Sequence, residues 1–117
     1  MITIEYCAQG EAVSDFAVRD WLDLVLNSTS GSVFRISTEA PVHALQLAIV
    51  SGTIAANNVT FMYCGHAFQA NEYGAIPERP LGFCDRSVAY SEDIVRAAMQ
   101  KRRRERNANV ANTQEAI

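Results

Sequence analysis

Strand-like and helix-like patterns alternate along this chain, and this alternation limits the possible folds more than any other feature of the sequence. Near the N-terminus, Ile2, Ile4 and Tyr6 alternate with polar residues, which predicts a strand with one buried face. A turn is expected to end it at residues 9–10. Residues 59–64 are apolar on both faces, so we expect this strand in the interior of a sheet. The expected strands cover residues 2–7, 33–36, 59–64 and 66–70.

Two amphipathic helices are predicted between these strands, and a third is predicted near the C-terminus. Before each helical pattern stands a serine or threonine as the expected N-cap, namely Ser14, Thr38 and Ser91. Gly52 is the expected end of the second helix. The residues expected to dock the three helices are Val18, Trp21, Leu22, Val25 and Leu26; Val42, Leu45 and Ile49; and Ile94, Val95, Ala98 and Met99.

This order of elements predicts a small α+β fold, with a sheet of three to five strands and two or three packed helices. A chain of 117 residues is long enough to bury a hydrophobic core without disulfide bonds. We expect a single domain over residues 1–106 that ends in a basic helix, followed by a flexible C-terminal tail over residues 107–117.

The cysteines and the N-terminus indicate a compartment. Cys7, Cys64 and Cys84 are an odd number without C-x-x-C spacing, which is typical of a reduced protein. The chain begins with a charged strand-like run rather than a signal sequence, and no apolar run reaches the ~18 residues of a membrane span. We therefore expect a cytoplasmic protein without membrane contact, located in the host cytoplasm if a phage encodes it.

Charge is distributed unevenly along the sequence. Residues 1–95 carry four arginines against eleven acidic residues, a net charge of −7, whereas residues 96–106 carry six basic residues against Glu105, a net charge of +5. The basic run 101–106 either contacts nucleic acid or an acidic partner, or is a solvated helix end that complements the helix dipole. Nucleic acid is not expected, because no aromatic residues interleave with the run and the acidic body repels phosphates.

Residues 71–90 contain no periodic pattern, and loops of this length in compact domains are often functional. Amide, guanidinium and aromatic groups gather there, and a nucleotide-like ligand requires these groups for base edges, phosphates and stacking. The candidate ligand-binding residues of the loop are Asn71, Tyr73, Arg79, Phe83, Asp85 and Arg86. The alternative is a polar surface loop pinned to the core by Tyr73 and Phe83.

Metal-binding and catalytic patterns are weak. Cys64 and His66, with Cys7 and Cys84 elsewhere, lack the second closely spaced pair that is typical of a zinc site. No third group is placed to orient a Cys–His nucleophile, so an enzyme built on Cys64, His66 or Asp85 is the least supported hypothesis. We expect no enzymatic activity, no metal and no cofactor.

The order of several motifs resembles the C-terminal end of ABC- and SMC-like ATPase domains. The similar segments are residues 36–39, 45–54, 59–63, 71–74 and 80–85. Ser37 and Thr38 stand where that family has its switch histidine, and the chain contains no G-x-x-x-x-G-K-[ST] sequence, its only lysine being Lys101. ATP hydrolysis is therefore not implied, because the loop that holds the phosphates is missing.

The chain also resembles the Thoeris anti-defence family of small phage proteins in size and in its mixture of strands and helices. This resemblance implies binding, without degradation, of cyclic ADP-ribose-type immune signals such as glyco-cyclic ADP-ribose, and in some members of cyclic oligonucleotides. It further implies ligand contacts from Phe61, Asn71 and Arg86, and a homo-oligomer of two or more copies. The alternative is a phage or bacterial protein–protein interaction module that inhibits or assembles with a macromolecular partner.

Overall fold

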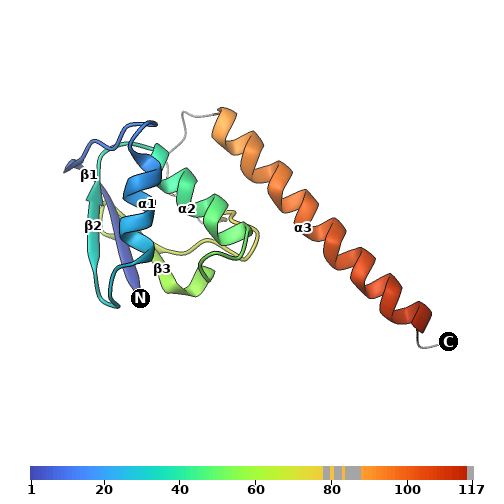
Figure 1. Cartoon of the computed structure of the whole chain (residues 1–117). Helices are drawn as coiled ribbons and strands as arrows, with labels where there is room; N and C mark the ends of the chain where they lie inside the picture. Colours follow the sequence, from blue (N-terminus) through green and yellow to red (C-terminus); the bar gives the residue numbers. More distant parts are fainter. Residues whose placement is uncertain (78–79, 81–82, 84–87, 116–117) are drawn as a thin grey trace.

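The structure is a computed structural model of the chain, and it describes residues 1–77, 80, 83 and 88–115. These residues form a single α+β domain with three α-helices and a four-stranded mixed sheet, which confirms the predicted fold class (Figure 1). The strands are β1 (Ile2–Glu11), β2 (Val33–Ile36), β3 (Val59–Tyr63) and β4 (His66–Phe68). The helices are α1 (Val18–Leu26), α2 (Ala40–Val50) and α3 (Val88–Glu115), with a 3-10 turn η1 (Ala56–Asn58) before β3.

The sheet has the strand order β2-β1-β3-β4, so β3 is an interior strand as the sequence predicts. β1 runs parallel to both β2 and β3, with Ile4 aligned with Phe34 on one side and Phe61 on the other. β4 returns antiparallel to β3. The connection between them is a two-residue turn, in which Cys64 and Gly65 have φ angles of +50° and +81°, the signature of a tight hairpin.

One face of the sheet carries the hydrophobic core. Ile4, Val59 and Phe61 on this face are at most 1% exposed. The helices contribute Trp21, Val25, Val42, Leu45 and Ile49. The last three are the residues predicted to dock α2, so this prediction is confirmed. α2 is buried on most of its circumference because it contacts α1 on one flank and α3 on the other (Figure 1). A helix that is apolar almost all round is stable only in such a surrounded position.

The other face of the sheet is not covered by any helix or strand of the described residues. Thr3 and Met62 on this face are half-buried, and Arg35 is an exposed side chain whose Nε lies 3.4 Å from a carboxylate oxygen of Glu5. Because α1 and α2 lie on the same face while β2 and β3 flank β1 on opposite sides, the two parallel crossovers must have opposite hands. One of them is therefore of the uncommon left-handed kind.

The predicted turn at residues 9–10 is wrong, because β1 continues to Glu11. A register irregularity between Tyr6 and Glu11 lets both residues pair with Ile36 of β2, and Ser37 then donates its backbone N–H to the carbonyl of Glu11. Gly10 fits here because a Cβ atom at this position would collide with the backbone of Ile36. The glycine therefore marks a close approach of two chain segments rather than a turn.

The predicted N-caps are also wrong. The hydroxyl of Ser14 accepts a hydrogen bond from the backbone N–H of Ala17, in the turn before α1, and the hydroxyl of Thr38 donates to the carbonyl of Val13. Neither α1 nor α2 has a side-chain cap, whereas the predicted end of α2 is confirmed, since Gly52 follows the helix with a φ of +84°. Ser91 does not cap α3, which begins at Val88 and continues to Glu115 through most of the expected tail.

Candidate functional site

Two of the predicted ligand-binding residues, Phe61 and Phe83, lie in the core. Phe61 is 0% and Phe83 is 1% exposed. The ring of Phe83 meets those of Phe68 and Tyr6 at centroid distances of 4.8 and 5.6 Å, and that of Phe61 at 6.3 Å. Edge-to-face contacts of this kind stabilise a core beyond the area they bury. Phe83 thus fastens the long loop to the sheet, and in this conformation neither ring offers a free face to a ligand.

Asn71 begins the loop and organises its first turn. Its Oδ1 atom accepts hydrogen bonds from the backbone N–H groups of Tyr73 and Ala75, at 3.0 and 3.1 Å. The backbone N–H of Asn71 donates to the carbonyl of Ala75, and that of Gly74 donates to the carbonyl of Asn71. Asparagine is favoured in such turns because its short side chain replaces a backbone acceptor. Among the described residues the Nδ2 group of Asn71 has no partner, so it remains available to a ligand.

Tyr73 contacts α3 rather than the core. Its hydroxyl donates a hydrogen bond of 2.9 Å to Oε2 of Glu105, and the cationic groups of Lys101 and Arg102 lie 5.3 and 4.6 Å from the centre of its ring. Lys101 also donates from Nζ to the carbonyl of Glu72 at 2.8 Å. The hydrogen bond to Glu105 is the main cause that raises the pKa of Tyr73 above its ordinary value of 10.0. The basic segment of α3 is therefore attached to the loop at its first turn.

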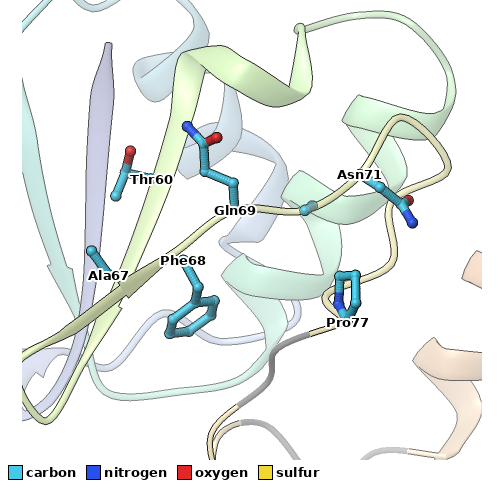
Figure 2. Close-up of a pocket in the computed structure, with 7 residues that line it drawn as sticks. Thr60, Ala67, Phe68, Gln69, Asn71 and Pro77 are labelled. Atoms are coloured by element: carbon cyan, nitrogen blue, oxygen red, sulfur yellow. The ribbon is translucent and has the colours of Figure 1, made fainter.

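A groove of about 590 Å³ opens at the β4 edge of the sheet (Figure 2). It is lined by Thr60, Ala67, Phe68, Gln69, Ala70, Asn71 and Pro77. Figure 2 shows Thr60, Ala67 and Phe68 on the strands, and Asn71 and Pro77 on the segment that follows them. The hydroxyl of Thr60 and the amides of Gln69 and Asn71 supply hydrogen-bonding groups beside an apolar surface. Among the described lining residues there is no arginine or lysine.

The structure brings together only part of the predicted site. Asn71 lines the groove, Phe61 lies behind it through a stacked contact with Phe68 at 6.0 Å, and Tyr73 is two residues further along the same turn. The predicted residues Arg79, Asp85 and Arg86 lie outside the described residues. Sequence reasoning did not identify Thr60 or Gln69, whose side chains lie in or beside strands and carry no distinctive motif.

A buried polar chain behind the groove was not predicted either. Gln46 of α2 is 2% exposed, and its Nε2 donates a hydrogen bond of 2.8 Å to the carbonyl of Gly74. Its Oε1 lies 3.1 Å from Nδ1 of His43, which is fully buried. Since an amide oxygen only accepts, Nδ1 of His43 carries the proton in this arrangement. This chain of hydrogen bonds fixes the first turn of the loop to the core.

The thiols do not form a metal site in the described part of the chain. Cys7 is half-buried in β1, Cys64 is exposed in the hairpin turn, and Cys84 lies outside the described residues. No cluster of three or more histidine, cysteine, aspartate or glutamate side chains suited to a metal ion occurs among the residues described. The described helices include none that is long and apolar enough to span a bilayer.

The fold and the groove together define a small α+β domain with an open groove at the sheet edge, whose described lining residues are uncharged. Comparison with protein-family models, with curated proteins and with solved structures finds no match to this chain.

Proposed function

We propose that this protein binds and sequesters a nucleotide-derived immune signal of the cyclic ADP-ribose type, without degrading it, and so counters an anti-phage defence of the host cell. The groove at the β4 edge is the observation that carries the proposal. Its volume of about 590 Å³ suits a dinucleotide-sized ligand. The free Nδ2 group of Asn71, the amide of Gln69 and the hydroxyl of Thr60 have the chemistry that recognises base edges and ribose hydroxyls.

We expect the charge that the described lining lacks to come from the sequence of the loop that begins at this groove. Arg79 and Arg86 lie in its sequence, and guanidinium groups pair with phosphate oxygens. We expect Arg86→Ala to lower the affinity for the signal at least about tenfold, with little change in stability. Glyco-cyclic ADP-ribose is the first ligand to test, and cyclic oligonucleotides are the second.

The experiment measures binding and turnover together. The protein is mixed with glyco-cyclic ADP-ribose, its melting temperature is recorded, and the ligand is released by heat and analysed by chromatography. A raised melting temperature and recovery of intact ligand support the proposal. Asn71→Asp keeps the turn acceptor but replaces the free donor with an oxygen, so it should abolish the shift, whereas Asn107→Asp on exposed α3 should not. No retention of the signal, or recovery of an altered one, would overturn the proposal.

A protein–protein interaction module is the second candidate, and two uncovered surfaces favour it. Parallel strands are rarely left bare on one face, yet no described element covers the face that carries Thr3 and Met62. The exposed basic residues of α3 form a second surface that would suit an acidic partner. This candidate predicts salt-sensitive co-purification of a macromolecular partner that is lost in the Arg103→Glu/Arg106→Glu variant.

A further inference from the structure

Another cavity lies on the helical side of the molecule, between α1 and α3. Its volume of about 430 Å³ is within the range of small-ligand sites. Val18, Arg19 and Leu22 of α1 line it on one side and Ala97 of α3 on the other, while α2 lies between these helices and forms the floor (Figure 1). We call this cavity the helical cleft. It shares no described lining residue with the groove at the β4 edge, so the two are separate sites.

The helical cleft is open because small side chains line it on two of the three helices. Ala44 and Ala48 lie one turn apart on α2, and Ala97 belongs to α3. The other apolar lining residues are Val18, Leu22, Leu47 and Val50. None of the described lining residues is aromatic, so the cleft offers an aliphatic surface without a ring for stacking.

The hydroxyl groups of the lining are engaged with each other and with the backbone. The hydroxyls of Ser51 and Thr53 lie 3.1 Å apart, and Ser51 also donates to the carbonyl of Ala48 at 3.1 Å. Polar groups of a ligand would lose water in such surroundings without gaining equivalent hydrogen bonds. The interior of the cleft therefore favours an alkyl chain over a sugar or a nucleobase.

Arg19 is the single charged residue among the described lining residues. It is exposed, and it forms no ion pair with any residue that the structure describes. An arginine stem covers apolar surface while its charged end stays in water, so this charge belongs to the mouth of the cleft. Asp23, four residues further along α1, is exposed but does not line the cleft. An aliphatic interior with a cation at its mouth is complementary to an alkyl chain that ends in an anion.

We propose that the helical cleft binds a free medium-chain fatty acid, with the alkyl chain on α2 between α1 and α3 and the carboxylate at Arg19. From Ala44 to Ser51 the floor of the cleft extends about 10 Å along α2, at about 1.5 Å per residue, which suits a chain of medium length. The carboxylate accepts hydrogen bonds from the guanidinium group in a solvent-exposed ion pair. The inference does not depend on signal binding, and its test contains no nucleotide, so either proposal can fail alone.

The test is calorimetric titration of the full chain with octanoate, nonanoate and decanoate, each below the concentration at which it forms micelles. Each added CH₂ group should lower the Kd about threefold to fourfold, because it removes more apolar surface from water. Decanol, which has the same chain without the charge, tests Arg19. The ratio of the decanol Kd to the decanoate Kd should fall about two- to fivefold in Arg19→Gln, as for an exposed ion pair. Arg96→Gln is the matched control, since Arg96 is exposed on α3 but does not line the cleft, and it should leave the ratio unchanged.

Ala97→Phe fills the helical cleft from α3 and should weaken decanoate binding at least about tenfold. Its control is Val95→Phe, which adds the same ring at a position that is 58% exposed and outside the lining, and which should bind as the wild type does. If Ala97→Phe does not fold, the chain-length series and the Arg19→Gln ratio decide. A wild type that does not bind decanoate, a Kd that is independent of chain length, an unchanged ratio in Arg19→Gln, or a folded Ala97→Phe that binds normally would overturn the proposal. Binding of the wild type to anionic phospholipid vesicles, without binding of free decanoate, would assign the cleft to a membrane surface and also overturn it.

Discussion

The side-chain amide of Gln46, in the middle of the buried helix α2, donates a 2.8 Å hydrogen bond to the backbone carbonyl of Gly74, at the start of the candidate ligand loop. The other end of the same amide faces Nδ1 of His43 at 3.1 Å. The turn that contains the groove residue Asn71 is therefore held in place by a hydrogen bond from α2. A buried amide with both ends satisfied rigidifies its surroundings, since each of its partners would be costly to leave without a hydrogen bond.

Gln46→Leu is expected to lower the free energy of unfolding by about 2 kcal/mol, because it removes the partner of the Gly74 carbonyl and the acceptor beside His43. Urea denaturation measures the change. The control is Gln69→Leu, in which an exposed glutamine also donates to a backbone carbonyl, at 3.4 Å, and which should cost less than about 0.5 kcal/mol. Equal effects of the two substitutions would contradict a special role for the buried amide.

Gly74 tests the same junction from the loop side. It has a φ of +79°, and a Cβ atom there would lie 2.6 Å from the carbonyl oxygen of Gln46. Gly74→Ala is therefore expected to destabilise the protein by at least about 2 kcal/mol through backbone strain and collision together. Gly52 is the control for backbone strain without a collision. Its φ is +84°, and a Cβ atom at this position would have no other atom within 4 Å. Gly52→Ala should cost about 1 kcal/mol, and similar losses at both glycines would exclude a close approach at Gly74.

The hairpin between β3 and β4 offers a stabilising substitution. Cys64 holds a φ of +50° in the first position of a two-residue turn, where asparagine is preferred before glycine. Its side chain is exposed, so no packing is lost on replacement. Cys64→Asn is expected to raise the free energy of unfolding by about 0.5 kcal/mol, and Cys64→Val to lower it by about 1 kcal/mol. If the Cys64→Val variant has a higher melting temperature than the Cys64→Asn variant, the assigned turn geometry is wrong.

Local periodicity predicted the buried residues of α2 well, because they depend on neighbours within the same helix. Val42, Leu45 and Ile49 show this, since their spacing alone places them on the core side of α2. The prediction that Val95 and Met99 dock α3, in contrast, is wrong, since these side chains are 58% and 61% exposed.

The ends of elements were less predictable. Thr38 has the sequence context of an N-cap, yet its hydroxyl donates to Val13, which is distant in the sequence. Long-range partners of this kind decide where a capping residue is used, and they leave no local pattern.

Sequence reasoning identified one described residue of the groove lining, Asn71, but neither the rest of that lining nor its geometry. Asn71 was expected to contact a ligand, and it does line the groove, whereas Phe83 satisfies the alternative interpretation as a core anchor. An aromatic residue in a polar loop has the same sequence signature in both roles, and only the partners Tyr6, Phe61 and Phe68 distinguish them. Gln46 was missed because a polar residue inside an apolar helix indicates no partner by itself.

The contact between Tyr73 and α3 predicts a pH dependence. The hydrogen bond to Glu105 raises the pKa of Tyr73 above 10.0 in the folded protein, while the unfolded chain keeps the ordinary value. A group whose pKa is raised on folding stabilises the fold fully below its unfolded pKa and loses this contribution as the pH rises through the folded pKa. We therefore expect attachment of α3 at the loop to weaken as the pH rises above 10 and through the raised pKa of Tyr73.

Absorbance titration of the phenolate band in the wild type and in Tyr73→Phe isolates this group by difference. The difference curve should show a tyrosine that ionises above its ordinary range, because the phenolate would face the carboxylate of Glu105 across the broken hydrogen bond. In Glu105→Gln the acceptor oxygen remains but its charge is gone, so the midpoint should move back toward the ordinary value. A difference midpoint at or below the ordinary tyrosine pKa in the wild type would show that Tyr73 does not hold α3 through Glu105.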